Sequence, residues 1–469
     1  MKKTKIICSI GPASSDPSIM KQMVENGMNV ARINFSHATL EERKEVVSSV
    51  KIVRKLTNKQ VAILYDTKGP EFRNGMLENG EITLTSGNTI RVVKESILGT
   101  DKAFSVNHPQ ALDSLEVGNI ILLENGLMSI KVISKEDDGV TCKIINGGIL
   151  GNKKSLSVPG VHLDIPFISE EDREDIEYAC KHEGDFLALS FVSTKEDILE
   201  VRKILKEQNR EDLKLIAKIE STTGVANIKE IAEVSDGIMV ARGDLGVEAP
   251  MEELPILQKK IIDTCRHAGK FCIVATEMLE SMKKNARPTR AEVSDIANAV
   301  FNGTDAVMLS GETTTGKYPI ETVKYMASIC EKTEEFLEYN ININNVHKDI
   351  PGAIATSVVE TANLLNAKLI VTATMSGATA RLVSNLRPRS VILASCTKEE
   401  VARSLALNWA VYPVLTEEYN STDEIISDSI SKAEAFTQLN NGDLLVISGG
   451  FPNNKEEKST NFMKIEEIK

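Results

Sequence analysis

Residues 214–220 read Lys-Leu-Ile-Ala-Lys-Ile-Glu, a nearly continuous apolar run that closes on a lysine and a carboxylate. An apolar run without alternation indicates a strand buried on both faces, as in a parallel sheet. Comparable Ile- and Val-rich runs recur, each followed by a polar turn and a helix-like stretch, at residues 5–9, 28–34, 61–65, 186–191, 237–240, 270–275 and 306–309. These strand-and-helix units predict an α/β fold built on a (β/α)₈ TIM barrel.

The interval between residues 65 and 186 follows a different rhythm. Apolar and polar residues alternate there, with Gly, Asn and Asp between the runs, over 81–85, 119–123, 129–133 and 140–144. Such alternation with turn residues is typical of antiparallel strands and hairpins. We therefore predict a small β-barrel lid domain at residues 68–160, inserted after the third barrel strand. An insertion at that point lies on the carboxyl-terminal face of a barrel, where active sites form.

A third unit follows the barrel. The polar segment Asn340-Ile-Asn-Ile-Asn-Asn reads as a linker, and strands and helices alternate again after it. The predicted strands cover residues 369–372, 391–394, 411–415 and 444–448. We predict barrel residues 1–67 and 161–338, interrupted by the lid, and a carboxyl-terminal α/β domain at 339–469.

Composition limits the function classes. The chain has 469 residues, 55 Lys and Arg against 67 Asp and Glu, and a net charge of −12, which disfavours nucleic acid and anionic membranes as partners. Phosphates must then bind at local basic sites or through metal ions. The 7 cysteines form no CxxC pair, and no apolar run of membrane-spanning length occurs. These features are typical of a cytoplasmic protein with reduced thiols.

The strand end at residues 214–220 carries the first chemical signal. Lys218 and Glu220 are two residues apart and face the same side of a strand. The next strand ends in Ala-Arg-Gly-Asp, so Asp244 lies one strand away from Glu220. Two neighbouring carboxylates suit a hard divalent cation, with Lys218 beside it to neutralise a shared anion. The alternative is a buried ion pair without a metal.

The second and third predicted strands end in further polar groups. Arg32, Asn34 and Ser36 share one face, and Asp66 and Thr67 follow the next strand. Asn34, Ser36, Asp66 and the Thr67 carbonyl offer hard oxygens with one formal charge, which suits a monovalent cation. A turn network of hydrogen bonds is about equally consistent with this spacing.

Several further residues are candidates for binding phosphate or substrate or for transferring protons. Arg32 and Arg73 have the guanidinium geometry that matches phosphate oxygens, although a surface arginine is the commoner explanation for either one. Thr276 could hold a water or a substrate carboxylate, or simply cap a helix. Ser310 and Glu312 could relay protons. In the last domain, a helix start offers a phosphate cradle, or an ordinary capped turn, formed by Thr374, Ser376, Gly377 and Thr379.

Together these segments resemble the pyruvate kinase family, and the resemblance runs from residue 5 to the end of the chain. The matching pieces are Asn29-Val-Ala-Arg-Ile-Asn-Phe-Ser-His37, Asp66-Thr-Lys-Gly-Pro-Glu-Phe-Arg73, Ala217-Lys-Ile-Glu220, Met239-Val-Ala-Arg-Gly-Asp-Leu-Gly-Val-Glu248, Ala275-Thr-Glu-Met-Leu-Glu-Ser-Met282 and Val307-Met-Leu-Ser-Gly-Glu-Thr313. The resemblance implies phosphoryl transfer between phosphoenolpyruvate and ADP, giving pyruvate and ATP in glycolysis. It also implies Mg²⁺ (or Mn²⁺) and K⁺ as cofactors and a homotetramer.

The resemblance also assigns roles to residues. Glu220 and Asp244 match the Mg²⁺ ligands, and Lys218 matches the cation that stabilises the transferring phosphoryl group and the enolate. Thr276 matches the residue near the enolate's proton source. The remaining matches are Asn34, Ser36, Asp66 and Thr67 for K⁺, Arg32 for the substrate phosphate, Gly243 with Asp244 for the substrate carboxylate, and Asn34, His37, Arg73 and Lys154 for the nucleotide.

Two positions bear on regulation. Glu71 matches family members that need K⁺, so K⁺ activation is expected. Met375 stands where members regulated by fructose 1,6-bisphosphate often carry a basic residue, so the resemblance leaves the effector of the cradle open: a phosphorylated sugar, a nucleotide or none.

Two other functions remain as alternatives. A Mg²⁺-dependent aldolase or lyase barrel would use the Glu220 and Asp244 pair, but would need neither the inserted domain nor Arg32 and Arg73. A catalytically silent metabolite sensor on the same scaffold would be expected to lose Lys218 or a metal ligand, and all of them are intact.

Overall fold

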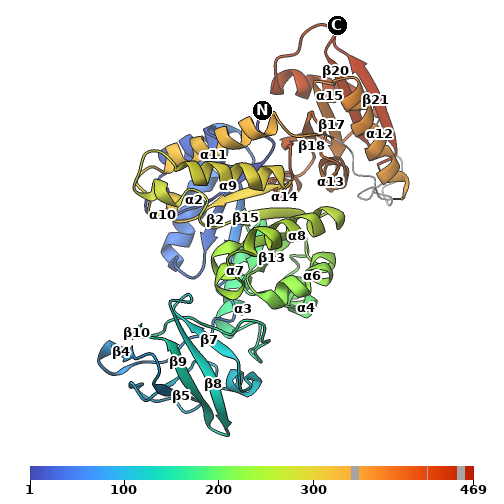
Figure 1. Cartoon of the computed structure of the whole chain (residues 1–469). Helices are drawn as coiled ribbons and strands as arrows, with labels where there is room; N and C mark the ends of the chain where they lie inside the picture. Colours follow the sequence, from blue (N-terminus) through green and yellow to red (C-terminus); the bar gives the residue numbers. More distant parts are fainter. Residues whose placement is uncertain (340–347, 420, 451–459) are drawn as a thin grey trace.

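The computed structural model describes residues 1–339, 348–419, 421–450 and 460–469. A central barrel carries the lid at one end and the carboxyl-terminal domain at the other (Figure 1). The predicted linker at 340–345 lies outside the described residues. Within them, no helix is both long and apolar enough to cross a membrane.

The barrel closes with all eight predicted strands. Its strands are β1 (Lys5–Ser9), β2 (Val30–Asn34), β3 (Ala62–Asp66), β12 (Phe186–Leu189), β13 (Lys214–Ile219), β14 (Gly237–Ala241), β15 (Phe271–Ala275) and β16 (Ala306–Leu309). Every neighbouring pair is parallel. Their side chains are buried on both faces, which explains the lack of alternation in the sequence. The TIM barrel prediction is confirmed.

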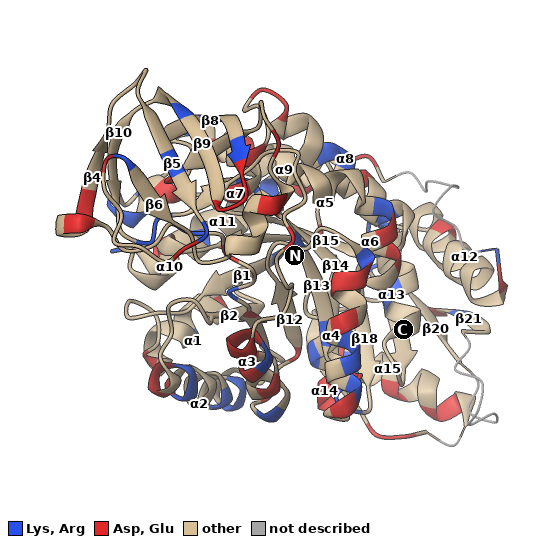
Figure 2. Ribbon diagram, turned by 90° about the horizontal axis from the view of Figure 1, so that it is seen from below, with Lys and Arg blue, Asp and Glu red and all other residues tan. Residues whose placement is uncertain are grey.

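Helices surround the barrel. They are α1 (Pro17–Glu25), α2 (Leu40–Thr57), α3 (Glu170–Lys181), α4 (Lys195–Glu207), α6 (Ile228–Val234), α8 (Leu254–His267), α9 (Arg290–Phe301) and α11 (Pro319–Glu334). Helix α3 begins with a capping box, in which the Ser169 hydroxyl accepts the Asp172 amide and the Asp172 carboxylate accepts the Ser169 amide. Lys, Arg, Asp and Glu are frequent on these outer helices (Figure 2), while the barrel strands β12, β14, β15 and β16 contain none.

The lid forms a separate sheet domain with its own apolar core. A two-stranded sheet pairs β4 (Glu81–Leu84) with β10 (Gly148–Gly151). A six-stranded sheet contains β5 (Thr89–Val93), β6 (Ala103–Ser105), β7 (Ile120–Leu123), β8 (Met128–Glu136), β9 (Gly139–Asn146) and β11 (Leu156–Ser157). The four predicted strands are present as β4, β7, β8 and β9. The strands β5, β6, β10 and β11 were not predicted; β6, β10 and β11 have only three, four and two residues.

The carboxyl-terminal domain is a five-stranded sheet with helices. The four predicted strands are present, and they pair in parallel: β17 (Leu369–Thr374), β18 (Val391–Cys396), β19 (Val411–Leu415) and β20 (Leu444–Gly449). An antiparallel fifth strand, β21 (Phe462–Glu467), pairs with β20 and was not predicted. The helices are α12 (Ile350–Leu364), α13 (Ala378–Asn385), α14 (Glu399–Ser404) and α15 (Thr422–Phe436).

This domain closes the amino-terminal end of the barrel. Leu407 is fully buried and joins the apolar cluster inside the barrel, together with Ile7 and Val30. Arg403 of α14 donates to Asp185, which directly precedes β12, at 2.8 Å. The floor of the barrel is therefore supplied by a different domain, and the opposite end remains for the site.

Replacing Leu407 with alanine tests this closure. We expect Leu407→Ala to lower the free energy of unfolding by about 3 kcal/mol, because a buried leucine leaves a cavity between two domains. The measurement is chemical denaturation. Leu364, which is 82% exposed, is the control, and its replacement by alanine should stay within about 0.5 kcal/mol. Equal effects of the two substitutions would contradict the packing described.

Candidate active site

The predicted site residues meet at the carboxyl-terminal ends of the barrel strands. A cavity of about 190 Å³ lies there. Eight of the residues predicted for the metals and the substrate line it: Arg32, Asn34, Ser36, Thr67, Lys218, Glu220, Asp244 and Thr276. Ser190, which was not predicted, lines it as well. Arg32 and Thr276, which are 244 positions apart in the sequence, thus share one small space.

Asp66 is the centre of the polar network. Its fully buried carboxylate accepts from Arg32 Nε at 2.7 Å and from Lys218 Nζ at 3.0 Å. Burial alone would raise the pKa of Asp66, but the two cations outweigh it and hold that pKa below its ordinary value. Arg32 also donates to Ser9 at 2.7 Å. The two cations are thereby fixed side by side in the cavity.

Lys218 is bound from three directions. Besides Asp66, its ammonium contacts Glu220 at 3.1 Å and donates to Ser190 Oγ at 2.7 Å. Burial opposes the charge of Lys218, yet Asp66 and Glu220 raise its pKa above the ordinary value. Lys218 is therefore a permanent cation at neutral pH, suited to stabilising negative charge and unsuited to acting as a base.

Glu220 has an unusual titration. Its carboxylate is 2% exposed and accepts the Phe191 amide at 2.6 Å. Burial raises the pKa of Glu220 to about 7; the Lys218 ammonium opposes that rise and the Asp244 carboxylate adds to it. Asp244 lies in the short helix α7 (Arg242–Glu248) at the end of β14. No group of three or more His, Cys, Asp or Glu capable of holding a metal occurs among the described residues, so a metal here would have two carboxylates and would keep other positions for substrate or water.

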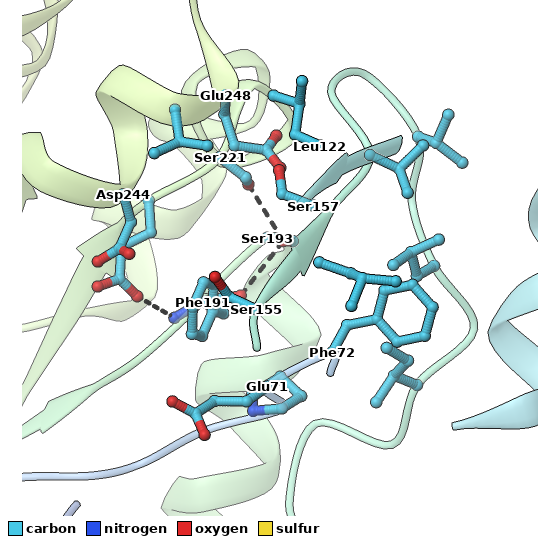
Figure 3. A pocket seen from close by; sticks show the side chains of 18 of the residues that line it. Glu71, Phe72, Leu122, Ser155, Ser157, Phe191, Ser193, Ser221, Asp244 and Glu248 are labelled. Carbon is cyan, nitrogen blue, oxygen red and sulfur yellow. Dashed lines mark hydrogen bonds between the residues drawn. The ribbon is translucent and has the colours of Figure 1, made fainter. Parts of the chain in front are cut away.

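A wider cleft connects this pair to the lid. It has a volume of about 430 Å³ and runs from Glu220 and Asp244 to the lid strands. Figure 3 shows Asp244 and Glu248 on one wall and Glu71 and Phe72 across from them. Ser157 of β11 donates to Glu248 of α7, which attaches the lid to the barrel beside the carboxylate pair.

Ser190 is a site residue that the sequence reasoning missed. It is 2% exposed, donates to the Thr67 carbonyl at 2.6 Å and accepts from Lys218. It directly follows β12, at the strand end where barrels carry functional side chains, and that position was the available signal.

The four predicted K⁺ ligands occupy one corner of the site. Asn34 Oδ1 accepts the Ser36 amide at 3.1 Å, and the Thr67 carbonyl accepts from Ser190. The turn network weighed as the alternative is thus present in the structure. The oxygens of Asn34, Ser36 and Thr67 still line the cavity beside Asp66.

The residues predicted to bind the nucleotide line two different cavities. Asn34, His37 and Arg73 line a cavity of about 580 Å³ next to the site. Arg73 is held there by Glu71 through two 2.8 Å contacts. Lys154 lines the wider cleft instead and pairs with Glu124 at 2.6 Å. Two other lysines line the cavity of about 580 Å³: Lys68 and the neighbour of Lys154, Lys153.

The loops after β15 and β16 bring Thr276 and Ser310 to the cavity. The Gly243 amide donates to Thr276 Oγ1 at 2.8 Å, so these two predicted residues touch. Glu312 is 1% exposed, and its carboxylate accepts the amides of Ser310 and Leu279 at 2.8 and 3.0 Å. Glu312 therefore holds the loops after β15 and β16 together, and the proton relay considered above stays a prediction.

The predicted effector cradle is a capped turn. Thr374 accepts the Gly377 amide at 2.9 Å, and Thr379 bonds with Thr460 at 2.7 Å. Gly377 has φ = 81°, which favours glycine at this position. Most of the last loop, residues 451–459, lies outside the described residues.

Two family models match this chain. The model described as "Pyruvate kinase, barrel domain" covers residues 1–323, and that described as "Pyruvate kinase, alpha/beta domain" covers residues 352–466. The chain belongs to the pyruvate kinase family. Members of this family are phosphotransferases, and phosphoenolpyruvate, pyruvate, ADP and ATP are their substrates and products.

Individual pyruvate kinases are similar in sequence over nearly the whole of this chain. The pyruvate kinase of Geobacillus stearothermophilus is 46% identical over 473 residues, covering 100% of this chain and 80% of that protein. A Staphylococcus aureus pyruvate kinase is 45% identical over 99% of this chain and 80% of its own length. A crystal structure of a pyruvate kinase from Cryptosporidium parvum superposes with a TM-score of 0.94 at 38% identity, covering 99% of this chain and 96% of that one.

Proposed function

We propose that this chain transfers the phosphoryl group of phosphoenolpyruvate to ADP, giving pyruvate and ATP, with Mg²⁺ (or Mn²⁺) and K⁺ as cofactors. The observation that carries the proposal is the pair of cations, Arg32 and Lys218, fixed on the buried Asp66 carboxylate beside Glu220 and Asp244. The matches to the two pyruvate kinase family models, and the similarity to pyruvate kinases over the whole of this chain, support it.

The chemistry of the donor sets fits the two ions. Glu220 and Asp244 offer carboxylate oxygens, which hard divalent cations prefer. Asn34, Ser36, Asp66 and Thr67 offer oxygens with a single formal charge, a set suited to K⁺. When bound, these cations neutralise charge on the phosphoryl group and polarise the enolate oxygen. Glu71, which forms an ion pair with Arg73, matches the family members that need K⁺, and we therefore expect K⁺ to activate this chain.

Phosphoryl transfer depends on positioning and charge neutralisation. Arg32 offers guanidinium nitrogens to the phosphate, while Lys218 sits within reach of both the phosphoryl group and the enolate oxygen left behind. Because Asp66 and Glu220 keep Lys218 protonated, this cation needs no reorganisation when negative charge develops. Arg73, His37 and Asn34 line the adjoining cavity, where we place the nucleotide.

The second half of the reaction protonates the enolate. Thr276 and Ser310 line the same cavity as Lys218, and Thr276 carries a hydroxyl that can pass a proton to the substrate carbon. Gly243, whose amide now donates to Thr276, is placed to donate to the substrate carboxylate. The lid, attached through Ser157 and Glu248, would exclude water while both steps take place.

The assembly and regulation are also proposals. We infer a cytoplasmic homotetramer from the family. The cradle of Thr374, Ser376, Gly377 and Thr379 is our candidate site for a phosphorylated effector, a sugar or a nucleotide.

A coupled assay of pyruvate formation from phosphoenolpyruvate and ADP, with Mg²⁺ and with or without K⁺, tests the function. We expect turnover that K⁺ stimulates. Lys218→Met should lose at least about 100-fold in kcat, because it removes charge stabilisation of the transition state, while substrate binding largely remains. Lys259→Met, at an exposed lysine of α8, is the matched control and should be unaffected. Absence of turnover under all conditions would overturn the proposal, and indifference to K⁺ would overturn only the inference from Glu71.

Metal binding should depend on pH. Below about pH 7 the metal must displace a proton from Glu220, whose pKa is raised to about 7, so Mg²⁺ or Mn²⁺ affinity should fall as the pH is lowered and level off above that value. Titration calorimetry in buffers of different ionisation enthalpy would detect the released proton. Glu220→Gln should bind the metal weakly and without this proton release. Constant affinity between about pH 5.5 and 8 would contradict Glu220 as a ligand.

A further inference from the structure

The turn after β15 holds two consecutive residues in the left-handed region. Thr276 has φ = 70° and Glu277 has φ = 53°. Among the described non-glycine residues with positive φ, Thr276 is the only β-branched one. A β-branched side chain in this region is strained, and such strain persists only where the surroundings impose it. Thr276 lines the reaction cavity, so the group that imposes this strained conformation also positions a side chain of the site.

Arg242 wraps around this turn. Its Nη2 donates to the Thr276 carbonyl at 2.6 Å and its Nε to the Ala275 carbonyl at 3.3 Å. The same Nη2 lies 2.9 Å from Met278 Sδ. One side chain thus contacts the residues before and after the strained pair and fixes the peptide of Thr276 itself.

Asp295 of α9 anchors Arg242. Both carboxylate oxygens accept from Arg242 Nη1, at 2.7 and 2.6 Å. The Arg242 side chain is 10% exposed and that of Asp295 is 33% exposed, so the guanidinium is shielded from solvent while its anchor reaches the surface. A planar guanidinium can serve two carbonyls and a carboxylate at once, whereas a lysine ammonium on a flexible stem cannot reproduce that fork.

The imposed conformation fixes the hydroxyl. Thr276 Oγ1 accepts the Gly243 amide at 2.8 Å and donates to the Ala275 carbonyl at 2.6 Å. Gly243 is the next residue after Arg242, so the same segment holds the threonine backbone from one side and its hydroxyl from the other.

We propose that Arg242, anchored by Asp295, is a positioning residue that sets the Thr276 hydroxyl for protonation of the enolate. This rests on the proposed function. In that step the electron pair of the enolate C2–C3 double bond takes a proton at C3 from the Thr276 hydroxyl, as the C2 carbonyl forms. The Thr276 oxygen then takes a proton from solvent, so each turnover consumes one solvent proton and leaves the side chain unchanged.

The test compares the proton step with substrate binding in Arg242→Lys. Exchange of the pyruvate methyl protons for deuterium, followed by NMR in D₂O with Mg²⁺, K⁺ and ATP, reports the proton step. We expect exchange and kcat to fall together by about 100-fold, as misplacement of a reacting group can cause, with KM for phosphoenolpyruvate changed by less than about threefold. In a Thr276→Ala background, Arg242→Lys should add little further loss, since both changes act through one hydroxyl.

Two further variants make the result decisive. Asp295→Asn keeps the guanidinium and removes its anchor, so it should slow exchange in the same direction, by a smaller factor, and it also serves if Arg242→Lys does not fold. Arg202→Lys is the matched control: Arg202 donates to the Val234 carbonyl at 2.8 Å and to Asp236 at 3.0 Å, at the opposite end of the barrel. Its exchange rate should equal that of the wild type.

The outcomes separate the two claims. Wild-type chain without pyruvate formation would overturn the proposed function. Active wild type with normal exchange in Arg242→Lys or Asp295→Asn would overturn the positioning role alone. Additive losses in the double variant would also overturn it, because they would place Arg242 on a path independent of Thr276.

Discussion

The site depends on one buried carboxylate that carries two cations. Asp66 is almost inaccessible to solvent and would be costly to ionise alone, but Arg32 and Lys218 both bind it. The negative charge of Asp66 also offsets the electrostatic repulsion between the two positive side chains in this small cavity. The arrangement needs three different barrel strands, β2, β3 and β13, to end at the same level, which the closed parallel barrel provides.

The same constraint explains how an acidic chain can bind polyanionic substrates. The net charge of −12 reflects the outer surface, where acidic and basic residues are spread over the helices (Figure 2). Inside the mouth, Arg32 and Lys218 are shielded from that surface and from solvent. Local charge, not the total, decides what the cavity attracts.

Much of this structure could be predicted from the sequence, and the successes have a common reason. Barrel strands are buried on both faces, so each one leaves a continuous apolar run, and residues two apart on such a run face one way. That geometry was enough to pair Lys218 with Glu220 and to bring Asp244 near them. Ser190 could have been found by the same rule, because it also follows a strand directly.

Other features are determined only by tertiary contacts. The role of Arg242 follows from a turn that is 34 residues away, and no local pattern marks it. Leu407 looks like any apolar residue until the barrel floor is in place around it. Strand β21 is paired only through β20 and carries charged residues on its exposed face, so its sequence resembles a loop. Lys153 and Lys154 are adjacent in the sequence but line different cavities, and only the folded structure shows which lysine lines which cavity.

The most direct test of this account is the rate of phosphoryl transfer in a single turnover of Asp66→Asn, measured by rapid quench. Asparagine keeps the shape of the side chain but cannot hold two cations in register. The rate should fall by about 100-fold or more relative to wild type, as misplacement of charged groups predicts, while Asp236→Asn at the other end of the barrel leaves it unchanged. A single-turnover rate in Asp66→Asn within about twofold of wild type would contradict the claim that this carboxylate organises the site.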